Sequence, residues 1–112
     1  MGKFVIIKTT NGEHFFSLKA DDSQIILTSQ LYSSKSDCID AIELVRTNCS
    51  EFNSYERKKS TNKKHYFVLK ASNGQIIGNS EMFETNVGMD NGIESVKKNG
   101  ISTSVVEEEP YF

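Results

Sequence analysis

The chain contains the same stretch of about fifty residues twice, and this duplication restricts its fold more than any other feature. Residues 18–26 read Leu-Lys-Ala-Asp-Asp-Ser-Gln-Ile-Ile, and residues 69–77 read Leu-Lys-Ala-Ser-Asn-Gly-Gln-Ile-Ile. Self-similarity at a fixed offset, here 51 residues, indicates a repeated structural unit. The same offset pairs identical residues elsewhere: His14/His65, Phe16/Phe67, Ile42/Ile93, Val45/Val96 and Asn48/Asn99.

A unit of about fifty residues buries too little apolar surface to be comfortable alone, so the two copies are predicted to form one domain around a pseudo-two-fold axis. Repeat one covers about residues 1–50 and repeat two about residues 51–106. The remaining residues, 107–112, form an acidic tail that we expect to be frayed.

Three short strands are predicted at the start of each copy. Residues 4–8 are β-branched and aromatic, residues 14–20 alternate apolar with polar side chains, and residues 24–29 continue that pattern. In the second copy the clear strands are residues 66–71 and 75–79. A weak strand-like stretch precedes them, followed by a basic hairpin loop.

The turns between strands set the predicted register. Asn11-Gly12 and Asn73-Gly74 are typical of two-residue type I′ turns, in which both central residues need positive φ. A two-residue loop at Asn11-Gly12 places Val5 opposite Leu18, and alternate residues then share one side of the sheet. The predicted core face of repeat one consists of Val5, Ile7, Phe16, Leu18, Ile25 and Leu27.

One amphipathic helix is predicted in each copy, at about residues 35–47 and from Thr85 to residue 99. Ser34 and Thr85 are the predicted N-caps, and Gly100 is the predicted left-handed residue that ends the second helix. Apolar residues recur at helical spacing on matching faces: Cys38, Ile42 and Val45, then Met89, Ile93 and Val96. These faces should cover the apolar side of the sheet. Residues 101–106 are predicted to form a last strand.

Composition excludes several classes of partner and compartment. The formal net charge of −2 gives no global attraction to nucleic acid or to an anionic membrane. The N-terminus has only four consecutive apolar residues, too few for a signal peptide or a membrane span, so we expect a cytoplasmic protein. Cys38 and Cys49 are interpreted as reduced thiols, with Cys38 packed as a small apolar side chain.

Residues 69–77, Ser80-Glu81 and residues 92–99 resemble the YegP-like family of small bacterial proteins. The resemblance implies an α+β fold: two tandem β(3)-α-β repeats form one antiparallel sheet with two helices on one face, and they exchange their C-terminal strands. It implies that residues 52–57 serve both copies, and that the last strand, residues 101–106, reaches back to the first copy's sheet. It implies no established biochemical activity.

Two surfaces are candidates for binding. The first is the sheet face opposite the helices, where aromatic rings and lysines could stack bases and hold phosphates, or contact a protein or small ligand. The second is the basic hairpin loop, although charged loops of this kind are usually just solvated. The predicted open face consists of Phe4, Phe15, Lys19, Ile26, Tyr66, Lys70 and Ile77. The predicted basic loop is represented by Arg57, Lys58, Lys63 and Lys64. The alternative for the open face is simple cross-strand packing.

No catalytic, metal or cofactor motif is recognisable. His14 and His65 occupy equivalent positions but lack further ligands at metal-binding spacing. Ser80, Glu81, Ser95 and Lys97 form no nucleophile elbow, phosphate loop or carboxylate pair. The sequence therefore predicts a non-enzymatic interaction or ligand-binding module without cofactors, and single-stranded nucleic-acid binding is the alternative.

Overall fold

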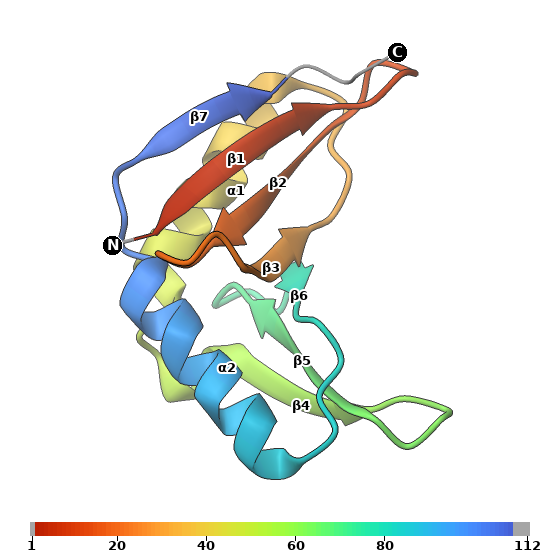
Figure 1. The fold of residues 1–112 in the computed structure, drawn as a ribbon. Coiled ribbons are helices and arrows are strands. Elements are labelled where there is room, and N and C mark those ends of the chain that lie inside the picture. The colour runs from red at the N-terminus through yellow and green to blue at the C-terminus, as the bar shows by residue number, and fades with distance from the viewer. Residues whose placement is uncertain (1, 109–112) are drawn as a thin grey trace.

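A computed structural model describes residues 2–108 and shows one seven-stranded sheet with two helices (Figure 1). The strands lie in the order β4-β5-β6-β3-β2-β1-β7. The elements in repeat one are β1 (Lys3–Lys8), β2 (His14–Lys19), β3 (Ile25–Ser29) and α1 (Lys35–Asn48). A short 3-10 helix, η1 (Phe52–Ser54), leads into β4 (Tyr55–Lys59), β5 (His65–Lys70), β6 (Ile76–Asn79), α2 (Asn86–Asn99) and β7 (Val105–Glu108). No helix within residues 2–108 is both long and apolar enough to span a membrane.

The two halves of the molecule meet where β3 lies antiparallel to β6. Thr28 pairs with Asn79 there, and these residues are equivalent at the offset of 51. Cys49 and Gly100 are also equivalent, and a Cβ atom on Gly100 would lie 2.8 Å from the Cys49 sulfur. Positions that meet their own equivalents lie near a two-fold axis. The predicted pseudo-two-fold arrangement is therefore confirmed.

The two copies exchange strands as the family resemblance implied. β4 follows α1 but pairs with β5, and β7 follows α2 but pairs with β1. In Figure 1, β7 crosses from the end of α2 to the outer side of β1. The β7–β1 pairing is parallel, so the sheet is mixed.

The last strand lies further along the chain than predicted. β7 begins at Val105 rather than at residue 101, and it includes Glu107 and Glu108, which the sequence assigned to the tail. The N–H of Phe4 donates to the carbonyl of Ser104, 2.9 Å away, where β7 approaches β1. The rest of the predicted acidic tail, residues 109–112, lies outside the described residues.

The hairpin loops differ from the predicted type I′ turns. Each of the four β-hairpins has a three-residue loop whose last residue alone has positive φ: Gly12 (87°), Ser23 (68°), Lys63 (67°) and Gly74 (87°). This is the type I turn with a G1 bulge, in which only the last loop residue is left-handed. The prediction of positive φ at Asn11 and Asn73 was therefore wrong.

The extra loop residue shifts β1 by one position. Phe4 lies opposite Leu18 and Ile6 opposite Phe16, so Phe4 and Ile6 enter the core while Val5 and Ile7 face the other side. The prediction for β1 was wrong because a one-residue slip turns every side chain of a strand to the opposite face.

Bulges in β3 and β6 move two more residues into the core. Two residues of β3 oppose Leu18, so Ile26 is buried, whereas Ile25 is 37% exposed. Ile77 is buried in the same way in β6. The sequence had placed Ile26 and Ile77 on the open face. That prediction was wrong, because the bulges turn both side chains into the core.

Both helices begin and pack as predicted. The Ser34 hydroxyl accepts from the N–H of Asp37 (3.1 Å), and the Thr85 hydroxyl accepts from the N–H of Gly88 (3.0 Å). The end of α2 differs from the prediction, because Gly100 has a φ of −67° and is needed for its close approach to Cys49. The helix residues buried in the single core are Cys38, Ala41, Ile42, Val45, Met89, Ile93 and Val96.

Two of the left-handed loop positions carry ordinary residues, and we expect glycine there to stabilise the protein. The left-handed conformation is destabilised by about 1–2 kcal/mol for a residue with a Cβ atom. Glycine avoids this penalty, but it loses more conformational entropy on folding, which offsets part of the gain. Ser23→Gly and Lys63→Gly should therefore each raise the free energy of unfolding by about 0.5–1 kcal/mol. Urea denaturation measures this change. A decrease in either variant would contradict the assigned turn geometry.

Candidate functional site

The structure separates the aromatic and lysine residues that were predicted to share the open face. Phe15 and Lys19 lie on β2, and Tyr66 and Lys70 lie on β5, all half-buried and opposite the helices. β3 and β6 stand between these strands, so the two pairs are about 14 Å apart across the sheet. Because β2 and β5 run in opposite directions, Phe15 and Tyr66 also lie toward opposite ends of the sheet. They do not form one stacking platform. Phe4, also predicted here, is fully buried in the core.

Lysines on the open face near β4 are paired with a carboxylate. Lys70 lies 2.9 Å from Glu56, and Lys58 lies 3.7 Å from the same side chain. The hydrogen bond from Lys70, followed by the nearby positive charges, lowers the pKa of Glu56. These cations are therefore partly neutralised within the protein itself.

The predicted basic loop divides between the two faces of the sheet. Arg57 points to the helix side and forms an ion pair with Asp90 of α2, whereas Lys58 lies on the open side. Lys64 pairs with Glu84 at 2.8 Å, and this hydrogen bond lowers the pKa of Glu84. Lys63 is exposed at the turn. The cluster that is continuous in sequence is therefore not one basic patch in space.

A groove of about 390 Å³ lies between β4 and α2. Its apolar part includes Phe52, whose exposed fraction is 75%, and Ile93. The residues that line it are Phe52, Tyr55, Arg57, Asp90, Asn91, Ile93, Glu94 and Lys97. β4 is the terminal strand of the sheet, and among residues 2–108 no strand pairs with its outer edge.

Tyr55 anchors this groove to the core. Its hydroxyl donates to the carbonyl of Cys49, and its ring meets Phe67 edge-on, with ring centres 5.6 Å apart. Burial is the largest cause of the raised pKa of Tyr55, so the hydroxyl stays protonated and remains a donor. These contacts therefore fix the start of β4 against the core on one side of the groove.

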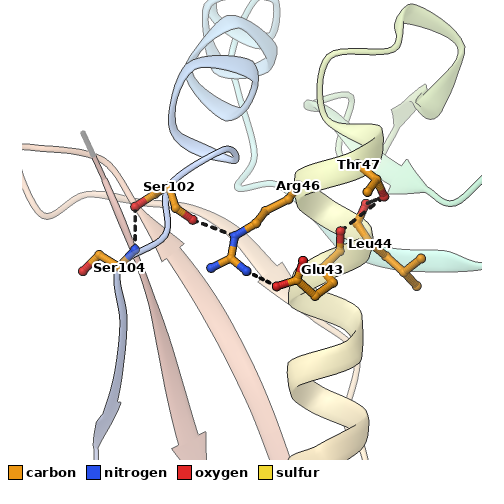
Figure 2. A network of polar contacts seen from close by, with 6 residues as sticks. All are labelled: Glu43, Leu44, Arg46, Thr47, Ser102 and Ser104. Atoms are coloured by element: carbon orange, nitrogen blue, oxygen red, sulfur yellow. Dashed lines mark hydrogen bonds and ion pairs between the residues drawn. The ribbon is translucent and has the colours of Figure 1, made fainter.

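The equivalent place in repeat one is already filled by the chain. There β7 covers the outer edge of β1, and Arg46 lies over the Phe4 ring, 5.4 Å from its centre. Figure 2 shows Arg46 held between Glu43 of α1 and the carbonyl of Ser102, to which its Nε donates at 2.8 Å. Lys35 also binds Glu107 of β7 at 2.7 Å. Repeat one thus shows what a strand docked at this position looks like.

This groove was not predicted from the sequence, although Arg57 and Lys58 were named as candidates. The sequence predicted no binding role for Asp90, Glu94 or Phe52, because no motif surrounds them. One signal was available: the two repeats share the segment at residues 52–57, so among residues 2–108 only one strand, β7, remains to lie beside either β1 or β4. Only the pairing of β7 decides which of these two equivalent strands keeps an unpaired outer side.

No catalytic or metal site emerges from the candidate polar residues. Among residues 2–108, no group of three His, Cys, Asp or Glu side chains could hold a metal ion. His14 bridges to Tyr32 and His65 to Phe83, each at the start of its own strand. Ser80 is buried, and its hydroxyl accepts from the N–H of Phe67 at 3.0 Å. Its role is to complete the backbone hydrogen bonds of β5 just beyond the end of β6.

Both cysteines are buried free thiols. Burial raises the pKa of Cys38 to about 11 from its ordinary value of 9.0, and it also raises the pKa of Cys49. We expect iodoacetamide to label neither thiol at about pH 8 until the protein is unfolded, because the thiolate is the reactive form. Mass spectrometry of native and urea-unfolded samples measures the labelling.

The raised pKa of Cys38 also predicts the pH dependence of stability. A group with a higher pKa in the folded state contributes its full stabilisation below the unfolded pKa, and this is lost as the pH rises toward about 11. Urea unfolding at about pH 8 and about pH 10.5 should show this loss, and Cys38→Ala should show a smaller one. An equal loss in both proteins would contradict the assignment.

Comparisons with known proteins agree with the duplicated fold. The family model described as "Domain of unknown function (DUF1508)" matches twice, at residues 10–56 and 60–107. The chain is 43% identical over 105 residues to a UPF0339 protein YegP of Yersinia pestis, covering 94% of each. It is 44% identical over 104 residues to YegP of Escherichia coli K12, covering 93% of this chain and 94% of that protein.

Two solved structures have the same architecture. A solution NMR structure of a UPF0339 protein from Shewanella oneidensis superposes with a TM-score of 0.91 at 41% identity, covering 96% of this chain and 92% of that one. The solution NMR structure of yegP from Escherichia coli gives a TM-score of 0.92 at 41% identity, covering 99% and 96%. The similarity includes both repeats and nearly the whole of each chain.

Proposed function

The chain belongs to the DUF1508 family, and from that premise we propose that it is a non-enzymatic interaction module whose open sheet edge, β4, receives an extended segment of a partner protein. The sheet remains the interacting element, as the sequence suggested. The binding position moves from the face of the sheet to its edge.

One observation carries the proposal: β1 and β4 occupy equivalent positions in the two repeats, but only β1 is covered by a further strand. β1 carries β7 on its outer side, whereas β4, its equivalent at the offset of 51, carries no strand within residues 2–108. An uncovered edge presents unpaired backbone N–H and C=O groups to solvent. Adding an extended peptide to such an edge is a recurrent mode of protein recognition.

The groove beside β4 supports the same function. Main-chain hydrogen bonds at a sheet edge provide affinity without specificity, and pockets for alternate side chains provide the specificity. Here the groove between β4 and α2 lies on the helix side of the edge, with Phe52 exposed at one end and the Arg57–Asp90 ion pair beside it. Apolar and charged contacts are therefore both available to an incoming side chain.

The nucleic-acid alternative has less support. Binding to phosphates requires clustered cations that release counterions, but Arg57, Lys58, Lys64 and Lys70 each have an acidic partner in the protein. The aromatic residues of the open face are also too far apart to stack neighbouring bases. An edge site needs neither feature.

Enzymatic activity has no support either. The groove offers two ion pairs, Arg57–Asp90 and Lys97–Glu94, and the Asn91 amide rather than a nucleophile with its base. The buried thiols have raised pKa values. Binding alone accounts for the groups that line this groove.

The test is a selection from a random peptide display library followed by footprinting on the full chain. Selected peptides should protect the amides of β4 from hydrogen exchange. The N–H of Ser60 donates to Lys64 across the β4–β5 hairpin, so alternation places the N–H of the preceding residue, Lys59, on the outer side of β4. Lys59→Pro should abolish peptide binding, because proline removes that outward donor without breaking the β4–β5 ladder.

Two control variants show whether the backbone edge itself is responsible for binding. Lys59→Ala removes the same charge but keeps the N–H, so it should bind nearly normally, and Lys19→Ala alters only the open face. Thermal melting checks that each variant is folded. If the selected peptides bind Lys59→Pro as well as the wild type, or if no peptide is selected, the proposed function is wrong.

A further inference from the structure

We propose that the segment received by β4 runs parallel to it and carries an apolar, a non-acidic and then two acidic residues, placed beside Tyr55, Glu56, Arg57 and Lys58 in that order. This inference rests on the proposed function and adds the orientation, the register and the chemistry of the partner. The partner is therefore an acidic extended peptide of another protein.

The orientation and the register follow from the strand that the molecule already holds. β7 lies parallel to β1, with Val105 beside Phe4, Val106 beside Val5, Glu107 beside Ile6 and Glu108 beside Ile7. Adding the offset of 51 to the β1 residues converts these positions to Tyr55, Glu56, Arg57 and Lys58. β4 also pairs with β5 in the same register as β1 with β2, so the outer edges of the two strands are comparable.

The charges along β4 select the residues at the third and fourth positions. Arg57 lies on the helix side of the strand and Lys58 on the open side, and both side chains are exposed. Arg57 already contacts Asp90, and Lys58 lies 3.7 Å from Glu56. A guanidinium group has five N–H donors and an ammonium group has three, so each side chain can serve a second carboxylate. Side by side in a sheet, opposite charges attract and like charges repel. Acidic residues therefore fit beside Arg57 and Lys58.

The first two positions have different requirements. The residue beside Tyr55 faces the groove, where exposed Phe52 and the edge of Ile93 offer an apolar contact. The residue beside Glu56 lies next to a carboxylate whose lowered pKa keeps it charged, so an acidic residue is disfavoured there. The order apolar, non-acidic, acidic, acidic is the order of β7 itself: Val105, Val106, Glu107 and Glu108.

The same charges disfavour a second copy of β4 as the occupant. An antiparallel β4–β4 pair centred on Arg57 would place the two Arg57 side chains opposite each other. Cations on an exposed edge commonly prevent such self-association. They admit an acidic strand for the same electrostatic reason, which makes the edge selective.

The experiment uses a synthetic peptide, Ser-Thr-Ser-Val-Val-Glu-Glu-Glu, which copies residues 102–109. Titrated into the isotope-labelled full chain, it should shift the amide signals of β4 and of the groove and leave those of β1 unchanged. Replacing the first two glutamates by glutamine should weaken binding about tenfold in total, because each exposed ion pair contributes only modestly to affinity. Added salt should weaken the binding of the glutamate peptide more than that of the glutamine peptide.

A charge exchange provides the matched control. Arg57→Glu should weaken the original peptide about tenfold. A peptide with lysine in place of the first glutamate should bind Arg57→Glu better than it binds the wild type. A spin label at the peptide N-terminus should broaden the signals near Tyr55, and a label at its C-terminus those near Lys59.

The outcomes distinguish this inference from the proposed function. The inference is overturned if the glutamine peptide binds equally well, if the spin labels report the reverse orientation, or if the peptide displaces β7 from β1. It is also overturned if binding appears only as concentration-dependent association of the chain. If library peptides bind the edge without these acidic residues, the proposed function stands and the inference fails. If binding is insensitive to Lys59→Pro, both fail.

Discussion

Replacing Gly78 by alanine is expected to lower the free energy of unfolding by about 3 kcal/mol, because there is no room for a Cβ atom between β6 and β3. A Cβ atom at this position would lie 2.6 Å from the carbonyl oxygen of Thr28 and 3.2 Å from the Cα of Ser29. Both are backbone atoms of the strand that joins the two repeats, and backbone in a paired strand cannot move aside cheaply. Urea denaturation gives the size of the effect.

Gly74→Ala is the matched control for this experiment. Gly74 has a positive φ of 87° but no atom within 4 Å of a Cβ position, so its cost is conformational and about 1–2 kcal/mol. Gly78→Ala should be the more damaging change of the two. A smaller effect at Gly78 than at Gly74 would mean that β3 and β6 are not packed as closely as the structure shows. The two repeats differ at this position, since the residue equivalent to Gly78 in repeat one is buried Leu27.

Replacing Phe67 by alanine is expected to lower the free energy of unfolding by about 4 kcal/mol, because it removes a fully buried ring and leaves a cavity. The ring meets Tyr55 edge-on and stacks on Phe83, with centres 6.3 Å apart. Phe83 in turn occupies the space left by Gly92, where a Cβ atom would lie 2.6 Å from its ring. The loss therefore spreads through the side of the core that supports β4.

Phe52→Ala is the matched control for Phe67→Ala. The same atoms are removed from a side chain that is 75% exposed, so the free energy of unfolding should change by about 0.5 kcal/mol or less. Chemical denaturation of the two variants tests the contrast. An equal cost would show that Phe52 is held in the core rather than presented to the groove. A stable Phe52→Ala variant is also suited to testing the contribution of this ring to peptide binding.

Local sequence signals predicted the elements that depend on local chemistry. The hydroxyls of Ser34 and Thr85 bond the first-turn N–H groups of α1 and α2 as expected, and the helix faces around Ile42 and Ile93 are buried. Alternation correctly assigned Phe16 and Leu18 to the core. These features depend on residues within a few positions of each other, and one sequence is enough to read them.

The errors in the strand faces came from loop and bulge geometry. A single residue more in the loop at Gly12 reversed the sides of β1, and Phe4 moved from the predicted open face to the core. Asn-Gly occurs in both turn types, so the dipeptide alone does not distinguish a two-residue from a three-residue loop. In the β5–β6 hairpin the longer loop is compensated by a bulge, which is why Leu69 lies opposite Gly78, the register that a two-residue Asn73-Gly74 loop would also give.

The candidate site was only partly accessible from the sequence. Arg57 and Lys58 were identified from their charge, but the sequence did not place them on opposite sides of one strand. Asp90 and Ile93 reach the groove from α2, more than thirty residues away along the chain. Their proximity depends on the way in which the helix crosses the sheet.

By itself the sequence determined that this protein is a duplicated unit with three strands and a helix in each copy, because periodicity and capping are recorded in neighbouring residues. Only the tertiary structure decided which of the equivalent strands β1 and β4 is covered, because the partner of β7 is chosen by contacts between residues about a hundred positions apart, such as Phe4 with Ser104. Both strands could accept a neighbour, and residues 2–108 supply one, β7. The outer side of β4 therefore stays unpaired because two strands could each accept a neighbour and only β7 is present among residues 2–108, which no local pattern in the sequence shows.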